Sequence, residues 1–126
     1  MMDRQSFDDG MSRLRGLFIR KLCERHDRLE LLAEALSDGV DPAQAAAQVE
    51  AILHKIAGAA GSVGLQTLGE EASRVECLIR DQRAVGICDV KGISAALDAF
   101  LDLSMDTCGT VGLATPLPSA QLAEAG

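Results

Sequence analysis

The sequence contains few aromatic residues and no long apolar segment. Three Phe are its only aromatic residues, with no Tyr and no Trp. Because strands favour aromatic and β-branched side chains, this composition argues against a β-sandwich or barrel. No apolar run reaches the roughly 18 residues of a membrane-spanning helix, so we expect no membrane segment. The opening residues, MMDRQSFDDG, lack the basic and apolar regions of a signal peptide, and we therefore expect a cytoplasmic protein.

The four cysteines also lack the spacing of a common metal or redox site. None of Cys23, Cys77, Cys88 and Cys108 belongs to a Cys-x-x-Cys pair. Cytoplasmic cysteines are usually reduced, so we expect free thiols. Cys23 and His26 are three residues apart, but no second pair completes a metal site, and we predict none.

Positive charge is too sparse for a nucleic-acid-binding protein. The chain has 12 Lys and Arg against 19 Asp and Glu, a formal net charge of −7. Contacts to nucleic-acid phosphates require clustered basic residues, so we expect no nucleic-acid partner. Residues 1–40 nevertheless hold 7 of the basic residues and only 8 of the acidic ones. This first segment forms either a solvated helix face of mixed charge or a rim that meets an acidic partner.

Ala and Leu are abundant, and both favour helices. Apolar residues recur at three- and four-residue intervals in four segments, which is typical of amphipathic helices. These segments span residues 6–39, 41–64, 65–79 and 90–105. Ser6 and Asp41 are the expected N-caps of the first two helices, and Pro42 fits a first helical position. We predict an all-α, antiparallel up-down-up-down four-helix bundle over residues 1–108 and a flexible C-terminal tail over 109–126.

His54 is expected on the exposed side of the second helix. At 100° per residue it lies about 160° from the apolar residues Ile52 and Ile56. Four of its neighbours on that face are small: Ala47, Ala51, Gly58 and Gly61. A glycine inside a helix costs about 1 kcal/mol relative to Ala, so Gly58 needs a reason other than helix stability. Either a partner approaches the imidazole closely, or the small residues pack against another helix.

An exposed imidazole is suited to phosphoryl transfer. In its neutral form it is nucleophilic through one ring nitrogen and can accept and pass on a phosphoryl group. The glycines from Gly58 to Gly64 do not form a nucleotide-binding loop, because no Gly-Lys-Ser/Thr follows them. The second histidine, His26, stands between charged residues and is expected to be a solvated helix residue.

One segment resembles a known family. Residues 52–65, ILHKIAGAAGSVGL, followed by Leu68, Ala72 and Val75-Glu76, look like the motif of the histidine-containing phosphotransfer (HPt) domain. The resemblance implies a four-helix bundle that relays phosphoryl groups between receiver domains of response regulators or hybrid histidine kinases. It also implies that His54 is the phosphoacceptor and that Gly58 clears space beside it.

The sequence departs from the family at the position three residues after the histidine. The family commonly has Lys there, whereas this chain has Ala57 and carries its basic residue at Lys55. Lys55 could bend back to the phosphoryl oxygens or remain solvated. Arg80 could hold phosphate or be an ordinary surface arginine. Glu50, one turn before His54, could accept a hydrogen bond from the imidazole and set its tautomer, or be a solvated glutamate.

The function implied is that of a phosphocarrier rather than of an enzyme with its own small-molecule substrate. A receiver domain with an aspartyl phosphate and its own Mg²⁺ would dock on the small residues, and the chain itself would bind no cofactor. The expected docking residues are Ala47, Ala51, Gly61, Leu17 and Phe18. We expect a monomer. The alternative function is a helical adaptor or inhibitor that binds a receiver domain or histidine kinase without accepting phosphate.

Overall fold

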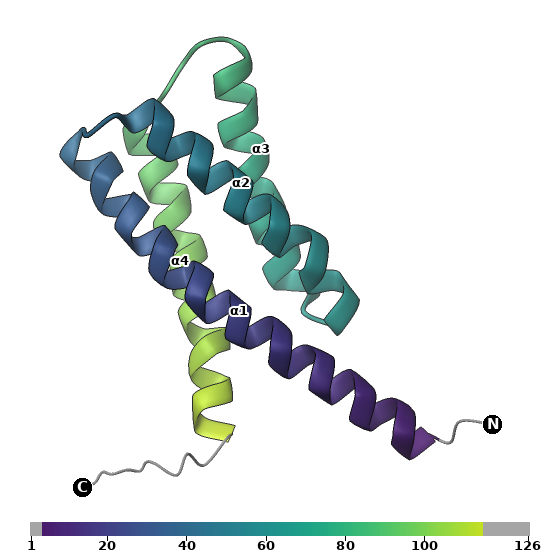
Figure 1. Cartoon of the computed structure of the whole chain (residues 1–126). Helices are drawn as coiled ribbons and strands as arrows, with labels where there is room; N and C mark the ends of the chain where they lie inside the picture. Colours follow the sequence, from purple (N-terminus) through teal and green to yellow (C-terminus); the bar gives the residue numbers. More distant parts are fainter. Residues whose placement is uncertain (1–3, 115–126) are drawn as a thin grey trace, which may run out of the picture.

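The computed structural model describes residues 4–114, and every regular element within that range is helical. The order is α1 (Arg4–Asp38), α2 (Pro42–Ala60), the short 3₁₀ helix η1 (Gly61–Val63), α3 (Gln66–Ala84) and α4 (Val90–Ala114). The chain reverses direction from each long helix to the next (Figure 1). The predicted all-α fold with four helices is confirmed.

All four helices contribute to a single apolar core. Leu22 of α1, Leu53 of α2, Ile79 of α3 and Phe100 of α4 are each fully buried. Burying a side chain of this kind stabilises the fold by about 1.5–3 kcal/mol relative to leaving it in water. The buried apolar residues follow the apolar stripes of the sequence, so the helical periodicity predicted which face of each helix turns inward.

The turn between α2 and α3 depends on Gly64. Its φ of 80° is in the left-handed region, which glycine adopts without steric cost. The Leu65 N–H donates to the Ala60 carbonyl at 3.0 Å across this turn, which closes the end of α2. The chain therefore reverses within a few residues, and α3 lies along α2.

The helix starts differ in detail from the prediction. Asp41 occupies the N-cap position of α2, but with φ 42° and without a capping bond from its side chain. Its carbonyl instead accepts from the Ala45 N–H at 3.0 Å. Pro42 is the first residue of α2, as predicted. Ser6 lies inside α1 rather than at its start, because α1 already begins at Arg4.

The predicted boundary between bundle and tail does not coincide with a helix end. Helix α4 runs through Gly109 to Ala114. Each glycine costs a helix only about 1 kcal/mol, so Gly109 and Gly112 are not enough to end it. The rest of the predicted tail, residues 115–126, lies outside the described residues.

The prediction for His26 is wrong. Its side chain is only 4% exposed, and its Nδ1 lies 3.0 Å from the hydroxyl of Ser104 on α4. Its Nε2 lies 3.3 Å from a Glu30 oxygen, without the alignment of a hydrogen bond. The flanking charged residues point outward because their spacing differs from that of His26, which shares the buried face with Leu22 and Leu29.

The cysteines are all free and all partly buried. Burial raises the pKa of the Cys108 thiol to about 12, and the neighbouring Cys23 and Asp27 act in the same direction. Among residues 4–114 there is no group of three potential metal ligands, and no helix in that range has the length and apolarity needed to cross a membrane.

Candidate functional site

His54 projects from α2 into solvent. Its side chain is 73% exposed, while Leu53 and Ile56 on the other side of the helix are fully buried. The exposure follows from its position away from the apolar stripe, as the helical spacing predicted.

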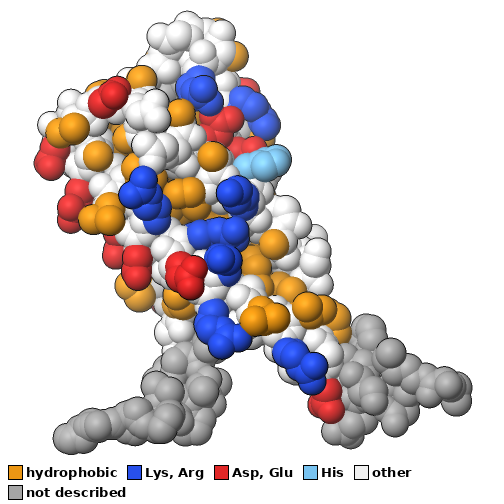
Figure 2. Space-filling model, viewed as in Figure 1, with side chains coloured by type: hydrophobic (Ala, Val, Ile, Leu, Met, Phe, Trp, Pro, Cys, Tyr) orange, Lys and Arg blue, Asp and Glu red, His pale blue; other side chains and the backbone are white. Residues whose placement is uncertain are grey.

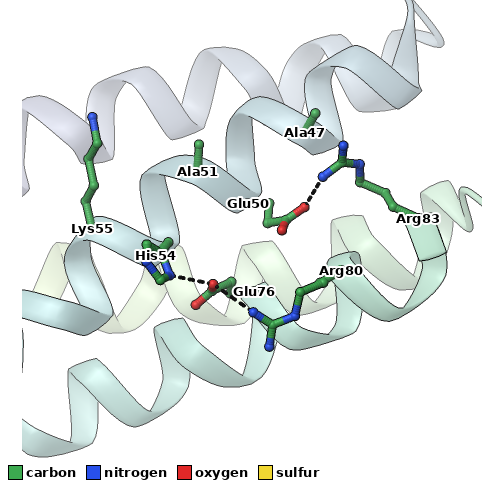
Figure 3. Close-up of a pocket in the computed structure, with 8 residues that line it drawn as sticks. All are labelled: Ala47, Glu50, Ala51, His54, Lys55, Glu76, Arg80 and Arg83. Atoms are coloured by element: carbon green, nitrogen blue, oxygen red, sulfur yellow. Dashed lines mark hydrogen bonds and ion pairs between the residues drawn. The ribbon is translucent and has the colours of Figure 1, made fainter.

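The imidazole is held by a carboxylate from the neighbouring helix. Its Nδ1 lies 2.7 Å from Oε2 of Glu76 on α3, and Glu76 is only 5% exposed. An ionised carboxylate can only accept hydrogen bonds, so Nδ1 carries the proton and donates. In the neutral ring the other nitrogen, Nε2, then keeps its lone pair. Figure 3 shows the contact between the His54 ring and Glu76. With Nδ1 engaged there, the site presents one nucleophilic nitrogen, Nε2.

Glu76 has a second partner. Arg80, one turn further along α3, donates from Nη1 to the same oxygen of Glu76 at 3.3 Å. The Arg80 side chain is 53% exposed, so the guanidinium extends from the buried carboxylate toward the surface (Figure 3). This arrangement places a fixed positive charge close to the imidazole.

Neither alternative left open for Glu50 holds: it makes no hydrogen bond to His54, whose Nδ1 pairs with Glu76, and its own side chain is only 17% exposed. Its carboxylate pairs with Arg83 of α3. The His54–Glu76 and Glu50–Arg83 pairs both connect α2 to α3. They lie one turn apart on α2 and two turns apart on α3. Sequence reasoning included Glu76 in the family-like motif but did not identify it as the partner of His54, because it lies 22 residues away on another helix.

A shallow hollow of about 430 Å³ surrounds the imidazole. It is lined by Ala47, Glu50, Ala51, His54, Lys55, Glu76, Arg80 and Arg83. Three cationic side chains thus surround two carboxylates that are already paired. Lys55 belongs to the lining, but its side chain points away from His54 and Glu76 (Figure 3).

The small residues beside His54 lie on an open surface. Ala51, Gly58 and Gly61 are exposed and Ala47 is half-buried. A Cβ atom added at Gly58 or Gly61 would meet no atom within 4 Å. Close packing against another helix within the described chain therefore does not explain these two glycines.

The glycine that does permit close packing is Gly69, which sequence reasoning missed. It is buried in α3, and a Cβ there would lie 3.2 Å from Ala60 Cβ and 3.5 Å from the Ala57 carbonyl. Gly69 lies within the apolar stripe of α3 in the sequence, and this position could have indicated that it is buried. Gly69 lets α3 approach the end of α2, and this approach places Glu76 within reach of His54.

The two predicted apolar docking residues on α1 differ in their exposure to solvent. Leu17 is 50% exposed and remains available to a partner. Phe18 is 7% exposed and belongs to the core, so its predicted role in docking is corrected. The next position along a helix turns by 100°, which is enough to separate an inward from an outward side chain.

Comparison with known proteins gives one family. A family model described as Hpt domain matches residues 13–105. The matched range includes His54, Glu76, the α2–α3 turn and most of α1 and α4. Neither the curated proteins nor the solved structures gave a match.

Proposed function

The chain belongs to the Hpt domain family, which carries out histidine phosphotransfer in two-component signalling, and from this premise we propose that His54 is its phosphoacceptor. In this proposal the chain receives a phosphoryl group from the aspartyl phosphate of one receiver domain and delivers it to another. It describes a cytoplasmic, monomeric phosphocarrier without a small-molecule substrate of its own.

The proposal rests on the different roles of the two nitrogens of the His54 ring. Nδ1 donates to Glu76 at 2.7 Å, so the exposed Nε2 is the nucleophile. Nε2 attacks phosphorus in line with the bond to the aspartyl oxygen; the N–P bond forms as the P–O bond breaks, and the carboxylate leaves with the electron pair. The ring becomes cationic, and the buried Glu76 carboxylate stabilises that charge through the bond at Nδ1.

Two basic residues of the hollow are candidates for holding the phosphoryl oxygens. Arg80 is already bonded to the carboxylate that holds His54, and a guanidinium has further N–H donors available for phosphate. Lys55 points away from the imidazole (Figure 3). We therefore assign the phosphoryl contact to Arg80. The Mg²⁺ of the reaction belongs to the receiver domain.

Docking of the receiver domain is assigned to the open surface around His54. Ala47, Ala51, Gly58 and Gly61 leave room for an approaching surface, since the two glycines face open space. Leu17 on α1 is exposed, and we assign it an apolar contact with the receiver domain.

The test compares the wild-type chain with His54→Gln. Each is mixed with a receiver domain that has been phosphorylated with labelled acetyl phosphate. We expect label on the wild type that is lost in acid and stable in base, as for a phosphoramidate, and no label on the variant. Label that persists on His54→Gln would reject the proposal. A wild-type chain that binds the receiver but takes no label would identify an adaptor instead.

A further inference from the structure

Two hydrogen bonds show how α1 lies along α2 and the following η1. Arg15 Nε donates to the Val63 carbonyl at 3.0 Å, and Arg28 Nη2 donates to the Gln48 side-chain oxygen at 2.7 Å. The two helices run in opposite directions and share the same rise per residue, so interpolation places about residue 23 of α1 level with His54. Lys21 and Arg25 flank that level.

Lys21, Arg25 and Arg28 form one edge of α1, which we call the cationic edge. Their spacing of four and three residues keeps them on the same side of the helix, the side from which Arg28 reaches α2. The Lys21 side chain is 58% exposed, Arg28 is exposed and Arg25 is half-buried. Lysine and arginine side chains run along α1 on the face that also carries a histidine (Figure 2).

Little negative charge offsets the cationic edge. The partner of Arg28 is the neutral Gln48 amide. One acidic residue, Glu24, lies on the same side of α1, and its exposed carboxylate is 3.7 Å from the Lys21 ammonium. The acidic residues Asp27, Glu30 and Glu34 turn about 100–160° away from Arg28, toward the other side of α1. The edge is therefore a local positive surface on a chain whose formal net charge is −7.

We propose that the cationic edge selects among receiver domains, favouring those whose surface around the phosphorylation site carries acidic side chains in addition to the carboxylates that hold Mg²⁺. This inference rests on the proposed function of His54. Salt screens charges beyond about 10 Å at 0.1 M, so a docking partner responds to the face it approaches rather than to the net charge of the whole chain. Opposite charges across an interface raise the association rate and exclude partners of the wrong sign.

The experiment reverses two charges of the edge. Lys21→Glu with Arg28→Glu is compared with the control pair Arg74→Glu with Lys91→Glu, which changes the net charge equally. Arg74 matches Lys21, since its side chain is 55% exposed and also pairs with an acid three residues away. Arg74 lies about 200° round α3 from Glu76. The probes are receiver domains phosphorylated with acetyl phosphate and chosen to range from acidic to basic surfaces.

We expect the edge variant to accept phosphate from acidic receivers about tenfold more slowly than wild type at 0.05 M salt, and nearly as fast at 0.5 M. The control pair should behave as wild type, and circular dichroism should show both variants folded. Equal rates for edge variant and wild type at low salt would overturn the role of the edge while leaving phosphotransfer intact. Failure of every receiver to label the wild type would overturn both the edge and the proposed function.

Discussion

At the scale of single residues, the imidazole of His54 and the carboxylate of Glu76 act as one unit. The sequence predicted the exposure of His54, because exposure follows from helical spacing. It did not predict Glu76 as the partner, because that contact depends on the register of α3 against α2. The nearer carboxylate, Glu50, looked suitable by spacing, yet it pairs with Arg83. Local spacing thus gives the face on which a residue lies, whereas a partner on another helix requires the tertiary structure.

Replacing the carboxylate should slow the chemistry without removing the nucleophile. In Glu76→Gln we expect phosphotransfer to His54 to fall about ten- to hundredfold, because a hydrogen bond to a charged acceptor contributes roughly 1.5–3 kcal/mol. Stopped-flow transfer rates measure the loss, and ¹⁵N NMR of the ring reports the tautomer. The matched control is Glu50→Gln, which should change the rate less than about twofold. A Glu76→Gln rate equal to wild type would contradict the positioning role.

The thiol of Cys108 should be unreactive in the folded protein. Burial raises its pKa from 9.0 to about 12, and the thiolate is the reactive form. We expect native Cys108 to react with iodoacetamide much more slowly at pH 8–9 than in the urea-unfolded chain, with mass spectrometry giving the rate at each cysteine. The raised pKa also links folding to pH, because the folded protein holds the thiol proton more tightly than the unfolded chain. This contribution to the free energy of unfolding is complete below pH 9 and is lost as pH rises toward 12. Equal alkylation rates in native and unfolded protein would contradict this.

At the scale of helices, two glycines that look alike in the sequence have different uses. Gly58 faces open space, while Gly69 faces Ala60 and the Ala57 carbonyl. The sequence predicted a purpose for Gly58 from its cost to the helix. It could not distinguish an open surface from a packed one, because that depends on where α3 lies.

Substitutions at Gly58 should distinguish its effect on the stability of the fold from its effect on docking of the receiver domain. We expect Gly58→Ala to stabilise the chain by about 0.5–1 kcal/mol, because Ala is the better helix former and has room there. Gly58→Gln should also fold stably but should slow phosphotransfer, since its side chain occupies the surface beside His54. Thermal unfolding and transfer rates measure the two effects. Unchanged transfer in Gly58→Gln would show that the partner does not need this space.

A substitution at Gly69 should affect stability instead. In Gly69→Val the added side chain meets Ala60 at a distance tighter than ordinary contact, and we expect a loss of about 1–3 kcal/mol. Urea denaturation measures the change. A stability equal to wild type would mean that α2 and α3 can separate without cost at this point.

At the scale of the whole molecule, the order and number of helices were predictable because apolar periodicity is a local property. The contacts that could not be predicted join residues far apart in the sequence. His26 looked solvated among charged neighbours, but its ring bonds to Ser104, 78 residues away, and ties α1 to α4. The extension of α4 through Gly109 was missed for a different reason: a composition rich in small residues is compatible with a helix as well as with a loop.

The bond between α1 and α4 should be measurable in stability. Ser104→Ala leaves the buried His26 Nδ1 without its partner, so we expect the free energy of unfolding to fall by about 1–3 kcal/mol. The control is Ser94→Ala on the same helix, whose hydroxyl is buried and finds no hydrogen-bond partner among the described residues; this variant should be close to neutral. Urea denaturation of both variants gives the comparison. Equal effects of the two substitutions would contradict a stabilising role for the His26–Ser104 bond.

The His54–Glu76 bond connects α2 and α3, whereas the cationic edge lies on α1. If the edge selects the receiver domain, substitutions in α1 would change that preference while His54 and Glu76 stay unchanged. Duplicated copies of the gene could then acquire different receiver partners through changes in α1. The same substitutions could be used to redesign the partner preference without altering the phosphorylation site.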